Sequence, residues 1–308
     1  MASIKDQETI PCPFCQSTDY SIYDKNEDWQ IVRCSKCDFT YTNPRPTIEA
    51  LPHYYSEEYF KDERHRAKFY NEDGTIKAQS DSYINRIQDV EQYFDKRGSV
   101  LEVGAARGGL LNELKKRGWQ VKGVEISQDA CNQAKILYGI DMFCGVLSEY
   151  NTDEKFDVIC MYQTLEHVPD PKEVLEKAYS LLKPNGVVVV EIPNRNCFES
   201  RYSSERKRLS YDLPRHLNHF TPAFLSNEME KMGYKIVEIE RNEHPIITSY
   251  LQRKHTGTVS SSTPSGNSAA TTSANIPMAR KPATMKAKLL ASFNKVIPGW
   301  RFTVTGRK

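Results

Sequence analysis

A short apolar run that ends in a glycine-rich turn constrains this chain more than any other feature. Val100–Val103 leads into Gly104, Gly108 and Gly109, and a helical pattern of apolar residues begins at Leu110. A turn of this kind brings the backbone close to a ligand at the N-terminus of a helix. The pattern predicts a strand, a ligand-binding turn and a helix in direct succession.

Strand and helix patterns alternate after this turn. Strands are expected at residues 100–103, 121–124, 156–161 and 186–192, and helices at residues 110–117, 128–138 and 172–182. Alternation of apolar strands with helices is typical of a parallel sheet covered on both faces. The expected fold class is therefore α/β, with a Rossmann-like, doubly wound, mostly parallel sheet.

Two closely spaced cysteine pairs lie near the N-terminus. Cys12 and Cys15 form the first pair, and Cys34 and Cys37 form the second. Two thiolates on one tight turn can bind the same ion, and two such turns complete a tetrahedral four-thiolate site. The residues between the pairs are typical of a β-hairpin, which predicts a small zinc ribbon with structural zinc. Redox-active pairs or disulfides are the alternative, which an intracellular chain disfavours.

Charge is distributed unevenly along the 308 residues. The sequence holds 42 basic and 40 acidic side chains, but residues 251–308 carry ten Lys or Arg and no acidic residue. Residues 1–250 therefore have a net charge of −8, which disfavours a nucleic-acid partner. The basic segment is either a solvated surface or a peripheral contact with a membrane. No apolar run is long enough to span a membrane and no signal peptide is recognised, so we expect a cytoplasmic protein.

Several motifs together resemble those of a known family. Glu102 stands two residues before Gly104, Glu125 ends the next expected strand, and the runs FDVI…LEHVPDP and LLKPNGVVVVEIPN follow. With these motifs, residues 98–240 resemble the class I S-adenosylmethionine-dependent methyltransferases. The cysteine pairs and the segment DLPRHLNHFT at 212–221 narrow the resemblance. They are similar to the branch of this family that carries a zinc ribbon. This branch resembles sugar C-methyltransferases and methyltransferases of surface-glycan pathways.

The resemblance implies that S-adenosylmethionine binds at the glycine-rich turn. The residues expected to bind it are Glu102, Gly104, Ala106, Gly108, Glu125, Ile126 and Gln163. Glu125 would accept hydrogen bonds from the ribose hydroxyls, Ile126 would pack against adenine, and Gln163 would approach the amino group. Ala106 departs from the family pattern, which usually has glycine there. Its methyl group would narrow the space near the methionine end of the cofactor.

Two groups of polar residues are candidates for the acceptor side. Glu166 and His167 follow the strand expected at 156–161, where open α/β sheets bind ligands. His167 is the candidate general base because imidazole titrates near neutrality, and Glu166 would orient it or contact the substrate. The candidate substrate contacts are Tyr54, Tyr55, Tyr59, Arg215, His216 and His219. A turn-capping role for His167 and a packing role for the tyrosines are the alternatives.

These motifs predict an organisation in five segments. They are a zinc ribbon (1–45), an aromatic lid and linker helix (46–97), the methyltransferase domain (98–245), a flexible Ser/Thr-rich insert (246–285), and a basic helix with the final strand of the sheet (286–308). The expected reaction is methyl transfer to a small-molecule acceptor, namely a sugar, nucleotide-sugar or glycan intermediate. An RNA methyltransferase and a non-catalytic scaffold are the competing hypotheses. Salt-dependent RNA binding would favour the RNA methyltransferase. Failure to bind the cofactor would favour the non-catalytic scaffold.

Overall fold

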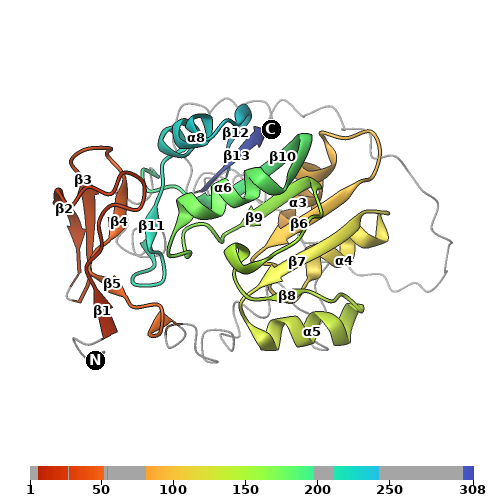
Figure 1. Cartoon of the computed structure of the whole chain (residues 1–308), viewed down its shortest axis with the longest axis horizontal. Helices are drawn as coiled ribbons and strands as arrows, with labels where there is room; N and C mark the ends of the chain where they lie inside the picture. Colours follow the sequence, from red (N-terminus) through yellow and green to blue (C-terminus); the bar gives the residue numbers. More distant parts are fainter. Residues whose placement is uncertain (1–5, 27, 52–53, 55–80, 198–210, 243–300) are drawn as a thin grey trace, which may run out of the picture.

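A seven-stranded sheet forms the centre of the molecule (Figure 1). The computed structural model describes residues 6–26, 28–51, 54, 81–197, 211–242 and 301–308. The strands are β6 (Ser99–Val103), β7 (Gln120–Glu125), β8 (Phe143–Cys144), β9 (Phe156–Tyr162), β10 (Leu182–Pro193), β12 (Lys235–Asn242) and β13 (Arg301–Arg307). They follow the order β12–β13–β10–β9–β6–β7–β8, in which β13 is antiparallel to both of its neighbours and the pairs from β10 to β8 are parallel. The expected Rossmann-like, mostly parallel sheet is confirmed.

The helices lie between the strands, as the alternating pattern predicts. They are α3 (Asp81–Glu91), α4 (Gly109–Lys116), α5 (Gln128–Tyr138), α6 (Pro171–Leu181) and α8 (Pro222–Lys231). Ser127, Asp170 and Thr221 cap the N-termini of α5, α6 and α8 by accepting a backbone N–H. After β6 the chain runs outward to β7 and β8, then returns to β9 on the other side of β6. Ligands bind outside the carboxyl ends of strands at such a reversal.

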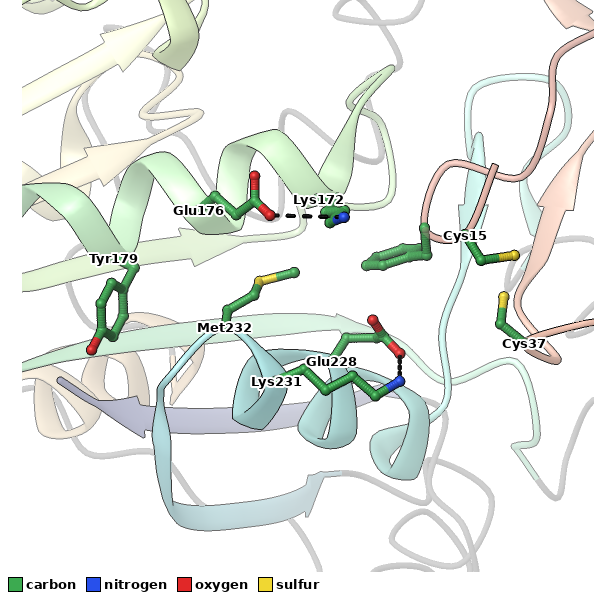
Figure 2. Close-up of a pocket in the computed structure, with 9 residues that line it drawn as sticks. Cys15, Cys37, Lys172, Glu176, Tyr179, Glu228, Lys231 and Met232 are labelled. Atoms are coloured by element: carbon green, nitrogen blue, oxygen red, sulfur yellow. Dashed lines mark hydrogen bonds and ion pairs between the residues drawn. The ribbon is translucent and has the colours of Figure 1, made fainter. Parts of the chain in front are cut away.

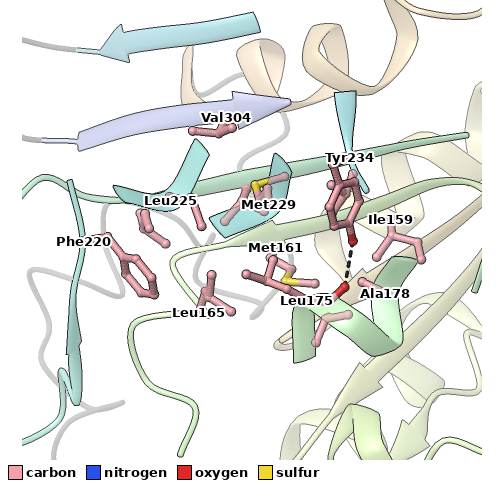
Figure 3. Close-up of a cluster of buried hydrophobic side chains, with 14 of the residues drawn as sticks. Ile159, Met161, Leu165, Leu175, Ala178, Phe220, Leu225, Met229, Tyr234 and Val304 are labelled. Atoms are coloured by element: carbon pink, nitrogen blue, oxygen red, sulfur yellow. Dashed lines mark hydrogen bonds between the residues drawn. The ribbon is translucent and has the colours of Figure 1, made fainter. Parts of the chain in front are cut away.

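One face of the sheet packs against α6 and α8 (Figure 3). Ile159 and Met161 of β9 contribute to this core, together with Leu175 of α6 and Met229 of α8. All four side chains are fully buried. The hydroxyl of Tyr234 donates a hydrogen bond of 2.8 Å to the carbonyl of Leu175, which satisfies a polar atom inside this core.

The N-terminal region forms a separate small sheet. Its own strands are β2 (Tyr20–Lys25), β3 (Gln30–Cys34) and β4 (Thr40–Thr42), all antiparallel, while β1 (Gln7–Glu8) pairs with β5 (Arg45–Pro46). A fourth strand, β11 (Asn218–His219), comes from the segment between β10 and β12 and pairs with β4. A two-residue strand has no local sequence pattern, so the sequence did not predict it.

Aromatic side chains join the two sheets into one core. Phe14 and Phe39 of the N-terminal region pack on Phe224 at the start of α8, with ring centroids 5.0 and 4.7 Å apart. Phe39 also lies 5.3 Å from the ring of Phe220. The N-terminal region is therefore held against the part of the chain that forms the seven-stranded sheet through buried apolar contacts.

Part of the expected organisation falls on residues that the structure does not describe. These are most of the aromatic lid, with Tyr55 and Tyr59, the Ser/Thr-rich insert, and the basic helix expected near 286–296. Among the described residues, no helix combines the length and apolar character needed to cross a bilayer.

Candidate active site

The glycine-rich turn between β6 and α4 has the backbone that a close ligand approach requires. Gly104 has a φ of +73°, and a Cβ atom there would lie 2.3 Å from Oγ1 of Thr164. Gly108, with a φ of +72°, precedes α4 without a side-chain cap, so the first N–H groups of α4 face no capping side chain. Such N–H groups at a helix N-terminus are suited to hydrogen-bond a ligand.

The carboxylate of Glu125 is fixed at the carboxyl end of β7. It accepts hydrogen bonds from the backbone N–H of Ala106 at 2.8 Å and of Ser127 at 2.9 Å. An ionised carboxylate has about four lone-pair positions, so it can also accept from the two hydroxyls of a ribose. Ala106 holds its place in the turn with a φ of +47°, a left-handed conformation that favours glycine.

Exposed apolar side chains flank Glu125. Ile126 is 71% exposed and Val146 is 37% exposed, and the N–H of Gly145 binds the carbonyl of Glu125 at 2.9 Å, which holds the two segments side by side. A large exposed aliphatic side chain next to a fixed carboxylate fits the flat face of an adenine ring. The sequence motif predicted Ile126 but not Val146.

Glu102 is buried beneath the turn. It is 5% exposed, and its Oε2 has no hydrogen-bond partner among the described residues. Burial raises the pKa of Glu102 to about 8, against a smaller opposing effect of the Arg86 charge. A buried acceptor without a partner is costly, and a ligand amino group would satisfy it. The residues around the turn therefore fit S-adenosylmethionine.

An ion-pair network that the sequence did not predict borders this site. Arg86 of α3 binds Glu191 of β10 at 2.9 Å and lies over the ring of Tyr162 at 4.6 Å. Arg301 of β13 reaches the same carboxylate at 3.4 Å. Gln163, expected near the cofactor amino group, donates its backbone N–H to the carbonyl of Glu191 at 2.8 Å. Arg86 belongs to no motif, so only the three-dimensional arrangement identifies it.

Glu166 and His167 lie together beyond the carboxyl end of β9. Glu166 is 1% exposed, and neither of its carboxyl oxygens has a hydrogen-bond partner among the described residues. Burial raises its pKa to about 8, and the negative charge of Glu191 contributes. His167 keeps 23% of its side-chain exposure, and its Nε2 is 4.0 Å from Oε1 of Glu166. His167 is therefore the member of the pair that a substrate can reach.

The ring of His167 has a defined orientation. Its Nδ1 is 3.0 Å from the carbonyl oxygen of Arg215. A carbonyl can only accept, so Nδ1 carries the proton and Nε2, which lies near Glu166, has a lone pair. Burial lowers the pKa of His167 below its usual range, and His216 adds to this effect. The imidazole is therefore neutral, whereas the pKa of Glu166 lies near the working range of a general base.

The segment around residue 215 brings some of the expected substrate contacts to this pair. The ring of His216 lies 4.7 Å from that of His167. Arg215 instead forms a two-bond ion pair with Asp212, at 2.6 and 3.0 Å. His219 is buried, and its Nε2 is 3.1 Å from Oγ1 of Thr42. The substrate roles of Arg215, His216 and His219 stay predictions.

Tyr54 is the one residue of the predicted aromatic trio that lies within the described part of the chain. Its ring packs edge-on against Trp29 of the N-terminal sheet, with centroids 6.0 Å apart. This contact fits the packing role that the sequence left open, and contact with a substrate is still to be tested.

The four N-terminal cysteines converge on one point. The Sγ atoms of Cys12 and Cys37 are 3.5 Å apart, as are those of Cys15 and Cys34. All four sulfur atoms lie within 4.8 Å of one another. A tetrahedral zinc site with Zn–S distances of about 2.3 Å places its sulfur atoms about 3.8 Å apart. The cluster therefore fits a four-thiolate zinc ion.

The two cysteine turns have the same backbone geometry. Gln16 and Asp38, each directly after the second cysteine of a pair, have φ values of 58° and 70°. In each turn, two backbone N–H groups also bind the sulfur of the first cysteine, those of Phe14 and Cys15 to Cys12 and those of Lys36 and Cys37 to Cys34. Hydrogen bonds of this kind stabilise thiolates, and the two tight turns agree with the prediction from the cysteine spacing.

A groove of about 450 Å³ separates the cysteine cluster from α6 and α8 (Figure 2). Cys15 and Cys37 lie at one end, and two ion pairs, Lys172–Glu176 and Lys231–Glu228, line its walls. Its described lining includes none of the residues expected to bind cofactor or acceptor. The residues expected to bind cofactor and acceptor lie instead at the carboxyl edge of the sheet.

Comparison with known proteins agrees with this geometry. Residues 76–239, more than half of the chain, match a family model described as a methyltransferase domain. A ubiquinone biosynthesis O-methyltransferase of Bradyrhizobium diazoefficiens is 36% identical over 102 residues, covering 32% of this chain and 40% of that protein. A ubiquinone biosynthesis O-methyltransferase of Coxiella burnetii is 30% identical over 175 residues, covering 52% of this chain and 74% of that protein.

Among solved structures, the chain resembles an S-adenosylmethionine-dependent methyltransferase from Archaeoglobus fulgidus. The TM-score is 0.49 at 19% identity, covering 73% of this chain and 92% of that one. The two curated relatives are named ubiquinone biosynthesis O-methyltransferases and not sugar C-methyltransferases, so they do not support the resemblance to that branch. By its family model and its curated relatives, the chain belongs to the class I methyltransferase family and is an S-adenosylmethionine-dependent methyltransferase.

Proposed function

We propose that this enzyme methylates a hydroxyl oxygen of a small-molecule acceptor, and that Glu166 and His167 together take the proton. The observation that carries the proposal is the buried, unpartnered carboxyl group of Glu166 beside the partly exposed imidazole of His167. Both curated relatives are named O-methyltransferases, which supports an oxygen acceptor.

Methyl transfer to oxygen requires both alignment and removal of a proton. When bound, S-adenosylmethionine supplies an electrophilic methyl group. Glu125 would hold the ribose, Ile126 the adenine, and Glu102 the amino group. An acceptor hydroxyl near His167 could pass its proton to Nε2. This nitrogen carries no hydrogen because the ring proton is on Nδ1, which donates to the carbonyl of Arg215. Burial raises the pKa of Glu166 to about 8, so Glu166 is ionised only above that pH, where it would stabilise the protonated ring or accept the proton itself.

The acceptor class is the finer part of the proposal. The motifs of residues 12–37 and 212–221 are similar to enzymes of sugar and glycan pathways, whereas the relatives are named for ubiquinone biosynthesis. A sugar, nucleotide-sugar or glycan hydroxyl remains our prediction, and a hydroxylated ubiquinone precursor is the competing acceptor that the relatives favour.

A methyl-transfer panel tests this proposal. The purified enzyme would be incubated with S-adenosylmethionine carrying a labelled methyl group, and with either nucleotide sugars or hydroxylated ubiquinone precursors. We expect label on an acceptor oxygen, and loss of that transfer in His167→Ala. Transfer to neither set, with the cofactor bound, would contradict the proposed acceptors, and transfer to carbon would contradict oxygen methylation.

We further propose that the four cysteines hold one structural zinc ion. Four thiolates complete a tetrahedral site and leave no position for a substrate. Lys231, whose pKa is raised by Glu228 and by the nearby thiols, supplies positive charge near the anionic cluster. A cytoplasmic location, the lack of a nucleic-acid partner, and peripheral membrane contact through residues 251–308 stay predictions.

A further inference from the structure

The N-terminal sheet is continuous with the segment that carries the acceptor-side residues. Strand β11 pairs with β4 in an antiparallel register, with Asn218 opposite Tyr41 and His219 opposite Thr40. The methyltransferase part thus contributes the edge strand of the zinc-ribbon sheet. The positions of β4 and of residues 218–219 are therefore coupled by this strand pairing.

Thr42, at the end of β4, fastens this segment with three hydrogen bonds. Its backbone N–H binds the carbonyl of Leu217 at 2.9 Å, and its hydroxyl donates to the carbonyl of His216 at 2.8 Å. A hydroxyl has a single hydrogen, so the contact of 3.1 Å with His219 has Nε2–H of the imidazole as donor. Thr42 is completely buried, which makes each of these bonds costly to lose.

The same segment holds the loop of the proposed catalytic pair. The backbone N–H groups of Leu217 and Asn218 both bind the carbonyl of Glu166, at 2.8 and 3.1 Å. The side-chain amide of Asn218 binds the carbonyls of Leu165 and Val168, at 3.3 and 2.7 Å. Together with the contact of His167 to Arg215, these bonds define the position of the whole turn.

We infer that Thr42 is a positioning residue for the acceptor side of the active site. Its hydroxyl links the zinc-ribbon sheet to residues 216–219, and these residues hold the backbone of Glu166 and the ring of His167. The inference rests on the proposed function only for its effect on catalysis. Thr164 links this turn to the cofactor side, because its carbonyl accepts the N–H of His167 and its hydroxyl donates to the carbonyl of Val103 in β6. Residues 216–219 bind the turn beyond Thr164, so the cofactor affinity should depend little on Thr42.

Substitution of Thr42 by valine tests the inference because valine has nearly the same shape without the hydroxyl. We expect Thr42→Val to lower kcat about tenfold for the acceptor identified in the methyl-transfer panel. The dissociation constant for S-adenosylhomocysteine should stay within about twofold of the wild-type value. Thr42→Ser, which restores the hydroxyl, should recover most of the activity.

Ser226→Ala is a matched control. Ser226 is buried in α8 and donates its hydroxyl to the carbonyl of Pro222 at 2.8 Å, so its loss removes a comparable buried bond elsewhere. We expect this variant to lose stability but to keep kcat. An equal loss of kcat in Ser226→Ala and Thr42→Val would overturn the inference, since general destabilisation would then explain both.

Amide hydrogen exchange gives a readout that needs no acceptor. In Thr42→Val we expect the amides of Leu217 and Asn218 to exchange at least about tenfold faster, while that of Gly104, bonded to Val124, is unchanged. Unchanged exchange at Leu217 and Asn218 would overturn the inference. If the wild-type enzyme methylates no acceptor, the proposed function fails, while this exchange result still decides the role of Thr42.

Discussion

The proposed cofactor side and the proposed acceptor side of this enzyme are built in different ways. The cofactor side comes from one short stretch, in which Glu102, Ala106 and Glu125 lie within two consecutive strands and their turns. The acceptor side joins residues far apart in the sequence, such as Thr42, His167 and His216. We infer that the first should tolerate changes in the N-terminal region, whereas the second should depend on it.

The largest effect expected on the acceptor side is from His167→Ala. General acid–base groups contribute about 10²–10⁴-fold to rates, so kcat should fall by at least about 100-fold. Steady-state kinetics measures this, with calorimetric titration of S-adenosylhomocysteine as the control. A variant with normal kcat, or one that loses cofactor affinity in parallel, would contradict the separation of the two sides.

The next effect concerns the metal. Cys34→Ser should remove the one zinc ion per chain that elemental analysis is expected to find, and should lower Tm by about 10 °C, since several kcal/mol of metal-linked stability is lost. Cys144→Ser is the control because Cys144 is exposed and lies outside the cluster. Full zinc content in Cys34→Ser would argue against the four-cysteine site.

The affinity for S-adenosylhomocysteine should depend on pH through Glu102 on the cofactor side. Burial raises the pKa of Glu102 to about 8, so the free enzyme carries a neutral carboxyl group below that pH. A cationic amino group binds the ionised form, and its binding must then release a proton. The affinity for S-adenosylhomocysteine should therefore rise with pH, by about tenfold at most between pH 7 and 8. Glu102→Gln should bind more weakly and without this slope, and a persistent slope would show that another group titrates.

The smallest effect expected is that of Ala106→Gly. The φ of +47° at Ala106 is a conformation that costs a residue with a Cβ about 1 kcal/mol. Glycine relieves it, although greater freedom in the unfolded chain offsets part of the gain, so the free energy of unfolding should rise by no more than about 1 kcal/mol. Thermal denaturation measures this. A large gain in cofactor affinity would instead mean that the methyl group obstructs the site.

What the sequence could predict follows the same division between the two sides. The sequence contains three local patterns that the structure also shows. They are the turn at Gly104, the strand end at Glu125 and the cysteine pairs. The alternation of strands and helices predicts β6, β7, β9 and β10 and their parallel sheet, whereas the order of the strands and the two-residue β8 come from the structure.

The contacts that the sequence did not predict depend on tertiary structure. Strand β11 is two residues long and forms only because it pairs with β4. Arg86 is held by an ion pair with the buried carboxylate of Glu191. The usual pKa of histidine led to His167 alone as the base. Burial lowers that pKa and raises the pKa of Glu166, an effect that no single-sequence pattern contains.

Calorimetric titration of the wild-type protein and of Glu125→Ala with S-adenosylhomocysteine tests the central claim most directly. Glu125 holds the turn at Ala106 and is the residue placed to bind the ribose. We predict micromolar binding to the wild-type protein and at least about 30-fold weaker binding to the folded variant, because two hydrogen bonds to a charged acceptor are lost. Equal binding to both proteins would contradict the cofactor site described for this enzyme.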